Sequence, residues 1–134
     1  MTSRIVKGWC HCGAITYSAI VDLTLPTIRC NCSICTKSRT WIAPIPASDF
    51  ELLSGDESLT EYQFGERTVV HCFCSRSGVK THGRVFGDAS RDALIAVCVS
   101  TLDLAPSQFA EIPISFIDGR NDRMEHQPGV TAYL

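Results

Sequence analysis

Eight cysteines are the residues in this sequence with the most definite chemistry, and they are clustered: Cys10, Cys12, Cys30, Cys32, Cys35, Cys72, Cys74 and Cys98. Side chains two apart on a strand point to the same face, so a Cys-x-Cys pair can direct both thiolates at one ion. The Cys32-Ser33-Ile34-Cys35 turn can do the same while its backbone N–H groups face the sulfurs. Such clusters are typical of zinc, which thiolates surround tetrahedrally.

The spacing predicts two zinc sites with different numbers of ligands. Cys30, Cys32 and Cys35 form a compact group of three. The second group comes from distant segments and comprises Cys10, Cys12, Cys74 and, as a candidate, Cys72. Zinc with four protein ligands is closed and structural, whereas zinc with three keeps one position open and is typical of catalysis. We therefore expect chemistry at the group of three.

Two other uses of the cysteines were weighed. Disulfides are disfavoured because the first residues, Met1 to Lys7, show no secretion signal and the cytosol keeps thiols reduced. A chain of this length and apolar content can also build a core without cross-links. Soft sulfur ligands suit iron–sulfur clusters as well, and spacing alone leaves that alternative open.

Length and composition restrict the class of protein. The 134 residues predict a single domain, 1–134, and 45% hydrophobic with 19% charged residues is a globular composition. The longest apolar run, Leu94 to Val99, is far below the roughly 18 residues of a membrane span. A net charge of −2 argues against nucleic-acid binding. We expect a cytoplasmic protein without a membrane or nucleic-acid partner, and the sequence allows a homodimer.

The elements that position the cysteines are predicted to be mainly β-strands, in an antiparallel fold with metal-binding turns at strand junctions. Pro44 restricts its strand to an edge or a bulge. Short helical turns are expected after Cys32 and at 106–109. The seven or eight expected strands include 15–21, 41–45, 50–53, a hairpin of 58–64 with 68–73 around Gly65-Glu66, 79–86, 94–99 and 112–117.

The cysteine motifs resemble a known family. Gly8-x-Cys10-x-Cys12-Gly13, Cys30-x-Cys32-x-x-Cys35 and Phe73-Cys74-Ser75-Arg76-Ser77-Gly78 are similar to the motif series of the glutathione-dependent formaldehyde-activating enzymes, a family that includes the centromere protein V group. Weaker stretches extend the resemblance over nearly the whole chain: Pro46 to Phe50, Leu53-Ser54-Gly55, Tyr62 to Gly65, Thr101-Leu102-Asp103 and Ile117 to Arg120.

The resemblance implies an Mss4-like fold of β-sheets tied by zinc. It implies a structural zinc on Cys10, Cys12 and Cys74, and a catalytic zinc on Cys30, Cys32 and Cys35. It also implies carbon–sulfur chemistry, typified by the addition of glutathione to formaldehyde to give S-hydroxymethylglutathione. Family members vary in substrate, so the exact reaction does not follow from the resemblance.

One residue departs from the family pattern, because Ser77 stands where the family has the second cysteine of its Phe-Cys-x-x-Cys-Gly motif. A neutral hydroxyl is a poor zinc ligand, so this site lacks one thiolate. Cys72 is the preferred substitute, since it shares a strand face with Cys74. His71 and His82 are the alternatives, as is a weakened or empty site. Zinc binding is also folding energy, so an empty site lowers stability by several kcal/mol.

These observations predict a zinc-dependent carbon–sulfur lyase or synthase acting on glutathione-type thiol adducts of small aldehydes. A thiol bound at the open zinc position loses its proton and attacks an aldehyde carbon, or the metal polarises the carbonyl. The alternative is a non-catalytic, zinc-stabilised binding module of the centromere protein V type. A metal-storage or thiol-redox protein is a third hypothesis.

Several other residues were considered as substrate contacts. Positive charge at Lys37 and Arg39 could hold the carboxylates of a glutathione-like thiol, with Trp41 nearby, although a solvated turn and a core tryptophan are the commoner outcome. Gln63 and Phe64 could line a pocket or simply pack in a strand.

The remaining candidates are expected to be structural or to lie on the surface. Cys98 is expected to be a small buried hydrophobe. Asp103 and Asp118 are expected to close turns. Solvated positions are expected for His11, for His126 and for the charged stretch of Arg120, Asp122 and Arg123.

Overall fold

The computed structural model describes residues 2–86 and 93–134 and contains ten strands in these ranges. The strands are β1 (Arg4–Trp9), β2 (Thr16–Val21), β3 (Thr27–Cys30), β4 (Trp41–Pro46), β5 (Phe50–Ser54), β6 (Leu59–Tyr62), β7 (Val69–Cys74), β8 (Lys80–Val85), β9 (Leu94–Cys98) and β10 (Ile114–Ile117). Two short helices, α1 (Ser33–Ser38) and α2 (Pro106–Ala110), join them, with 3₁₀ turns at Ala47–Asp49, Asp56–Ser58, Val99–Thr101 and Gly119–Asn121. The prediction of a mainly β fold is confirmed.

The strands form a sheet of three, β1-β2-β5, and a sheet of seven, β10-β3-β4-β9-β8-β7-β6. Within the described residues every paired strand is antiparallel except β10 with β3, where Ile114 lies opposite Thr27 and Ile117 opposite Cys30. The antiparallel prediction is therefore corrected at this one pair. Because the two strands run in the same direction, the segment after Ile117 emerges beside the segment after Cys30.

The core lies between the two sheets. Tyr17, Ala19 and Val21 of β2 are almost fully buried and belong to one apolar cluster with Ile45 of β4 and Val97 of β9. Alternate residues of β2 face this cluster because side chains on a strand point alternately to its two faces. Each fully buried aliphatic side chain contributes roughly 1.5–3 kcal/mol, so this cluster holds the sheets together.

Two strands that the sequence did not predict, β1 and β3, are positioned by their neighbours. β1 pairs with β2 along its whole length, from Arg4 opposite Val21 to Trp9 opposite Thr16. β3 has only four residues and lies between β4 and β10. The hairpin around Gly65-Glu66 is confirmed, as β6 and β7 with Tyr62 opposite His71.

Pro44 lies in a strand that is internal in the strand order, and the pairing pattern explains why this is tolerated. On one side Pro44 is opposite Ala96 of β9. On the other side the ladder to β3 covers only Trp41 and Ile42, so β4 has a free edge at Pro44. A proline nitrogen cannot donate a hydrogen bond, and a free edge requires no donor.

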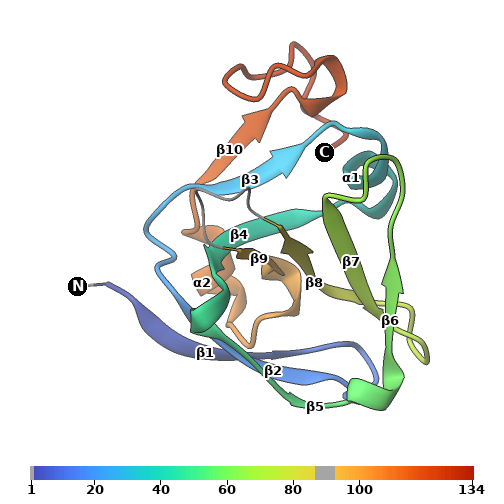
Figure 1. The fold of residues 1–134 in the computed structure, drawn as a ribbon. Coiled ribbons are helices and arrows are strands. Elements are labelled where there is room, and N and C mark those ends of the chain that lie inside the picture. Colours follow the sequence, from blue (N-terminus) through green and yellow to red (C-terminus); the bar gives the residue numbers. More distant parts are fainter. Residues whose placement is uncertain (1, 87–92) are drawn as a thin grey trace.

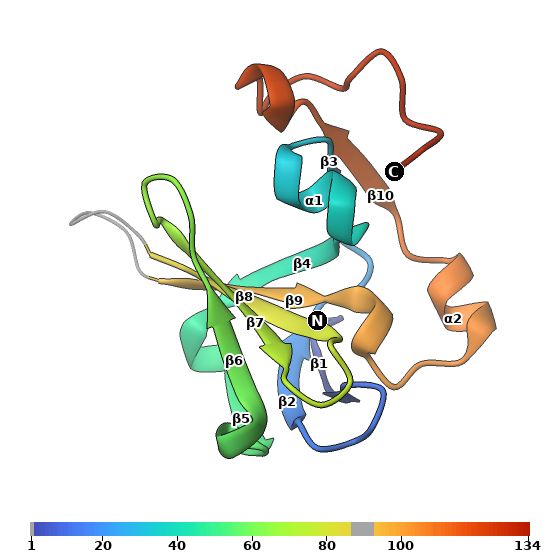
Figure 2. The same cartoon turned by 90° about the vertical axis from the view of Figure 1, so that its right-hand side faces the viewer.

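The two ends of the molecule carry different cysteines. Figures 1 and 2 show α1 and the C-terminal segment at one end and the β1-β2-β5 sheet at the other. Cys32 immediately precedes α1, whereas Cys10 and Cys12 lie between β1 and β2. Among the described residues, neither helix has the length and apolar character needed to cross a membrane.

Candidate metal centres

Three cysteines converge where β3 ends and α1 begins. The Sγ atoms of Cys30, Cys32 and Cys35 all lie within 4.8 Å of one another. Cys30 is the last residue of β3, and the chain turns directly after it, so that the N–H of Cys32 lies 3.4 Å from the Cys30 sulfur. The six residues from Cys30 to Cys35 thus deliver three sulfurs to one point, as the spacing predicts.

The sulfurs of this cluster share protons unequally. The side chains of Cys30 and Cys35 lower the pKa of Cys32 far below that of an ordinary thiol, and the backbone N–H groups of Cys35 and Ile34 lower it further. The neighbouring Cys30 and Cys32 raise the pKa of Cys35. Because Cys32 loses its proton readily, the cluster carries a negative charge that can attract a cation.

The C-terminal turn is fastened against this cluster by the side chain of Asn31. The Asn31 amide donates to Asp118 Oδ1 (2.9 Å), and the Asn31 carbonyl oxygen accepts from the Arg120 N–H (2.9 Å). Gly119, between them, packs so closely that a Cβ there would lie 2.5 Å from the Cys30 sulfur. The backbone of Gly119 therefore covers one side of the cluster, at a position where a side chain would clash with the Cys30 sulfur.

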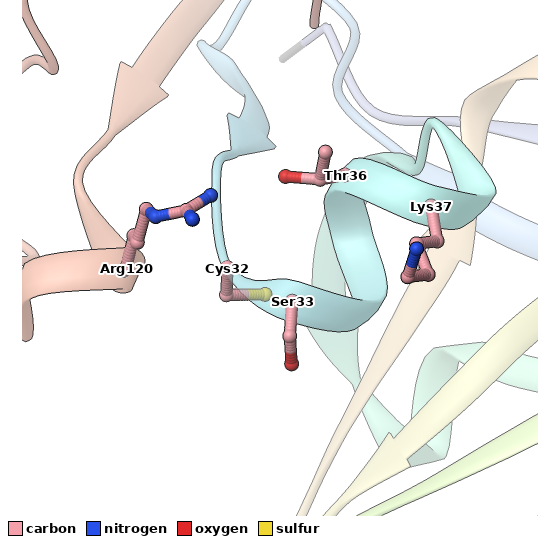
Figure 3. Close-up of a pocket in the computed structure, with 6 residues that line it drawn as sticks. Cys32, Ser33, Thr36, Lys37 and Arg120 are labelled. Carbon is pink, nitrogen blue, oxygen red and sulfur yellow. The ribbon is translucent and has the colours of Figure 1, made fainter.

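A pocket of about 500 Å³ opens beside Cys32. It is lined by Cys32, Ser33, Thr36, Lys37, Gly119 and Arg120. Figure 3 shows the Arg120 side chain extending from the C-terminal turn toward Cys32 and α1, with the Thr36 hydroxyl turned to the same side. One side of the pocket follows β3 and the other follows β10. The parallel pairing of these strands brings the two sides together from segments about 87 residues apart.

Two cationic side chains, those of Lys37 and Arg120, line the pocket beside Cys32. In residues 2–86 and 93–134 the one ion pair joins Arg84 to Glu61, so neither Lys37 nor Arg120 has a described carboxylate partner. Both side chains are exposed at the pocket. An anionic group entering beside Cys32 therefore finds two available cations, of which the guanidinium of Arg120 suits a carboxylate geometrically.

The second cluster joins the two sheets. The Cys12 sulfur lies 3.7 Å from the sulfurs of both Cys10 and Cys74, and the three lie within 4.8 Å of one another. Backbone N–H groups also face these sulfurs at 3.4 Å, from Ile15 to Cys10 and from Arg76 and Ser77 to Cys74. Cys10 and Cys74 are buried and Cys12 is exposed.

The polar groups close to the sulfurs of this cluster favour thiolates. The hydroxyl and then the N–H of Ser77 lower the pKa of Cys74 to about 6. Burial raises the pKa of Cys10, but the Ile15 N–H and the Ser77 hydroxyl outweigh it, so the pKa is lowered overall. Metal ions bind thiolates rather than thiols, so both clusters offer the form of sulfur that a soft cation requires.

The structure does not bring Cys72 to this cluster, which corrects the expectation that it supplies the fourth ligand. The Cys72 sulfur lies 3.7 Å from the Val70 carbonyl oxygen and 3.8 Å from Arg84 Nη1. The pairing of β7 with β8 shifts register between Cys72 and Phe73, so the regular alternation that would place Cys72 and Cys74 on one face is interrupted. Cys10 and Cys12 succeed because they lie in a turn beyond the end of β1.

The two histidines considered for the same role are engaged elsewhere. His71 Nδ1 lies 2.7 Å from Lys80 Nζ, and His82 Nδ1 lies 2.9 Å from Thr81 Oγ1. Burial lowers the pKa of His82 to about 4, and its ring packs 4.5 Å from that of Phe50. Neither belongs to a described cysteine group.

The residues present fit zinc at both clusters. In the described part of the chain, two buried side-chain oxygens have no hydrogen-bond partner, the hydroxyls of Thr36 and Ser77. Such atoms are rare in native structures, and a bound ion, a water molecule or a functional role can account for them. Thr36 lines the pocket at Cys32, and Ser77 adjoins Cys10 and Cys74. Three convergent thiolates at each place are a donor set typical of zinc.

Comparison with known proteins decides the family. Residues 5–117 match the family described as glutathione-dependent formaldehyde-activating enzyme, a span that includes both cysteine clusters. This chain belongs to the glutathione-dependent formaldehyde-activating enzyme family.

One solved structure is similar to this chain in both fold and sequence. The crystal structure of a Rhodobacter sphaeroides protein, a structural genomics target, matches with a TM-score of 0.68 and 34% sequence identity. The match covers 81% of this chain and 99% of the Rhodobacter chain.

The residues predicted to contact substrate lie in different parts of this glutathione-dependent formaldehyde-activating family member. Lys37 lines the pocket, whereas Arg39 ends α1 with a left-handed backbone (φ 50°) and does not line it. Trp41 donates from Nε1 to Thr27 Oγ1 and packs on Phe109. Gln63 donates to the Arg67 carbonyl.

Phe64 lies outside this pocket, where its exposed ring stacks on the exposed ring of Tyr62 and on the buried ring of His71. Cys98 is buried, which raises its pKa to about 11, as expected of a small buried hydrophobe. His11, His126 and Asp103 are exposed.

Sequence reasoning missed two residues of the site. Arg120 was expected in a solvated loop, and Asn31 was not considered. Asp118, expected to close a turn, accepts from the amides of both Asn31 and Asn121. Their positions in the sequence could have identified them. Asn31 lies between two predicted ligands, and Arg120 lies in the Ile117 to Arg120 stretch that resembles the family.

Proposed function

We propose that this protein is a zinc-dependent carbon–sulfur lyase or synthase that interconverts a carboxylate-bearing thiol and a small aldehyde with their adduct. Glutathione and formaldehyde, giving S-hydroxymethylglutathione, are the reference pair. The catalytic zinc is held by Cys30, Cys32 and Cys35, and a second, structural zinc by Cys10, Cys12 and Cys74.

One observation carries the proposal: a cluster of three sulfurs opens directly onto a pocket with two cations that have no carboxylate partner in residues 2–86 and 93–134. Cys32 belongs to both the cluster and the pocket lining. No fourth histidine, cysteine or carboxylate joins the three sulfurs among the described residues. A zinc ion with three protein ligands keeps one position for substrate.

Zinc bound here would lower the pKa of an incoming thiol and polarise a carbonyl oxygen, which makes the thiol nucleophilic near neutral pH. The protein supplies orientation. Arg120 and Lys37 bind the carboxylates of the thiol, and Arg120 is held in place through the hydrogen bond from its N–H to Asn31. The unpartnered Thr36 hydroxyl donates to an oxygen of the bound substrate.

The reaction needs no oxidant or reductant. In the synthetic direction a bond forms between the thiol sulfur and the aldehyde carbon, and the C=O π pair moves to the oxygen. The thiol proton ends on that oxygen, which becomes the hydroxyl of the adduct. In the lyase direction the hydroxyl proton leaves, the carbonyl reforms and the carbon–sulfur bond breaks.

The test is the rate of interconversion measured by NMR exchange with ¹³C-formaldehyde and glutathione, after subtraction of the uncatalysed rate. The wild-type protein is expected to accelerate exchange. Cys32→Ser is expected to abolish the acceleration and to reduce bound zinc from two ions to one, while the fold persists. Cys98→Ala, which removes a buried cysteine outside both clusters, is the matched control and is expected to retain both zincs and the rate.

Two results would overturn the proposal. One is full acceleration by Cys32→Ser. The other is a wild-type protein that holds two zincs, binds no glutathione and accelerates nothing, which is the behaviour of a structural binding module.

A further inference from the structure

The Cys10–Cys12–Cys74 cluster lacks a fourth sulfur, yet its setting is that of a structural site. It joins the β1–β2 connection to the end of β7, and two of its three cysteines are buried. Structural zinc is almost always bound by four protein ligands. The described cysteines, histidines and carboxylates provide only three at this position.

Ser77 has the position and the unmet bonding capacity of the missing ligand. Its N–H lies 3.4 Å from the Cys74 sulfur, three residues earlier in the same turn. Its hydroxyl oxygen is excluded from solvent and lies beside the sulfurs of Cys10 and Cys74, but it makes no well-oriented hydrogen bond. A serine hydroxyl can rotate and find water or a carbonyl wherever either is within reach, so a buried orphan hydroxyl requires an explanation.

We propose that the Ser77 hydroxyl oxygen is the fourth ligand of the ion held by Cys10, Cys12 and Cys74. The site is then a three-thiolate, one-oxygen site, with one negative charge fewer than four thiolates would give. A neutral hydroxyl is a weaker and harder donor than a thiolate. Since Cys12 is also exposed, this ion is held less tightly and exchanges faster than in an all-cysteine site.

The experiment measures zinc release to a colorimetric chelator from a Cys32→Ser/Cys35→Ser background, which leaves this cluster as the intact one. Ser77→Ala is expected to speed release at least tenfold, because only water can replace the hydroxyl. Ser77→Cys is expected to slow release at least tenfold. Ser75→Ala, an exposed serine in the same turn, is the matched control and is expected to change the rate by less than twofold.

X-ray absorption at the zinc edge gives a readout independent of rate. The parent is expected to show three sulfurs and one oxygen, and Ser77→Cys four sulfurs. Should Ser77→Ala fail to fold, the Ser77→Cys comparison still decides. The proposal is overturned by a parent with four sulfurs, by Ser77→Cys retaining three, or by Ser77→Ala releasing zinc at the rate of Ser75→Ala.

This inference rests on the structural zinc assigned under the proposed function, and the experiment separates their failures. A parent that binds no metal at this cluster overturns both the assignment and the ligand role of Ser77. A parent that binds one ion but is indifferent to Ser77 overturns the ligand role alone. Catalysis by the Cys30 centre is unaffected in either case.

Discussion

Replacing Gly119 by alanine is the smallest change expected to disable the Cys30 centre. The added Cβ would lie 2.5 Å from the Cys30 sulfur, whereas ordinary contact begins at 3.4 Å, so the sulfur or the turn must retreat by about 0.9 Å. Ligand distances in metal sites tolerate about 0.2 Å. The required movement is several times this tolerance, and the backbone conformation of Gly119 itself poses no obstacle to alanine.

The expected outcome of Gly119→Ala has two parts. Overpacking lowers the free energy of unfolding by roughly 1–3 kcal/mol. The protein is expected to bind one zinc instead of two and to lose its acceleration of adduct formation. Zinc content by mass spectrometry and thermal unfolding measure the two effects. Gly129→Ala is the control, because a Cβ there meets nothing within 4 Å.

The reasoning about this wall of the site would be refuted by a Gly119→Ala protein that retains two zincs with unchanged affinity. Loss of stability alone, with both zincs retained, would also contradict it, since the clash is with a proposed ligand rather than with the apolar core.

Three further predictions concern charge, tethering and pH. Arg120→Gln is expected to raise KM for glutathione at least tenfold in steady-state assays with little change in zinc content, while Arg39→Gln, outside the pocket, leaves KM unchanged. Asn31→Ala removes two hydrogen bonds and is expected to cost about 1–3 kcal/mol in urea unfolding, with faster zinc loss from the Cys30 centre. His82 has a pKa of about 4 in the folded protein against 6.5 ordinarily, so the unfolded chain takes up its proton first on acidification. Stability from this group is complete above pH 6.5 and falls by about 3 kcal/mol as the pH drops toward 4. His82→Gln is expected to remove this slope relative to wild type in unfolding titrations, and a His126→Gln control that also removes it would contradict the prediction.

The sequence contains enough information to predict the β character and much of the strand layout. The β6–β7 hairpin is marked locally by Gly65 between two runs with strand-forming residues. β3 has no such local signal, because four residues are too few to show an alternating pattern of apolar and polar side chains. Its position depends on its pairing with β4 and β10. The parallel pairing of β10 is likewise a tertiary property, since nothing within Ile114–Ile117 specifies which strand it joins or in which direction.

The candidate site could be predicted where its residues are close in sequence. Cys30, Cys32 and Cys35 converge through one turn, and their types and spacing are sufficient to indicate it. The choice of Cys72 was wrong because the period-two rule assumes a regular strand, whereas the register of β7 shifts between Cys72 and Phe73. Arg120 was missed because its charge acquires a role only through the β10–β3 pairing, which periodicity does not reveal.

The separation of the cysteines along the chain would give the two proposed zinc ions different roles in folding. Cys30 to Cys35 span six residues, so this segment can capture an ion while the rest of the chain is still unfolded. Cys12 and Cys74 are 62 residues apart, and an ion between them closes a long loop. By analogy with a disulfide of that span, the closure disfavours the unfolded chain by about 4 kcal/mol. If both proposed zinc ions bind, the first could therefore be acquired locally, whereas the second would require the two sheets to have come together and would then hold them in place.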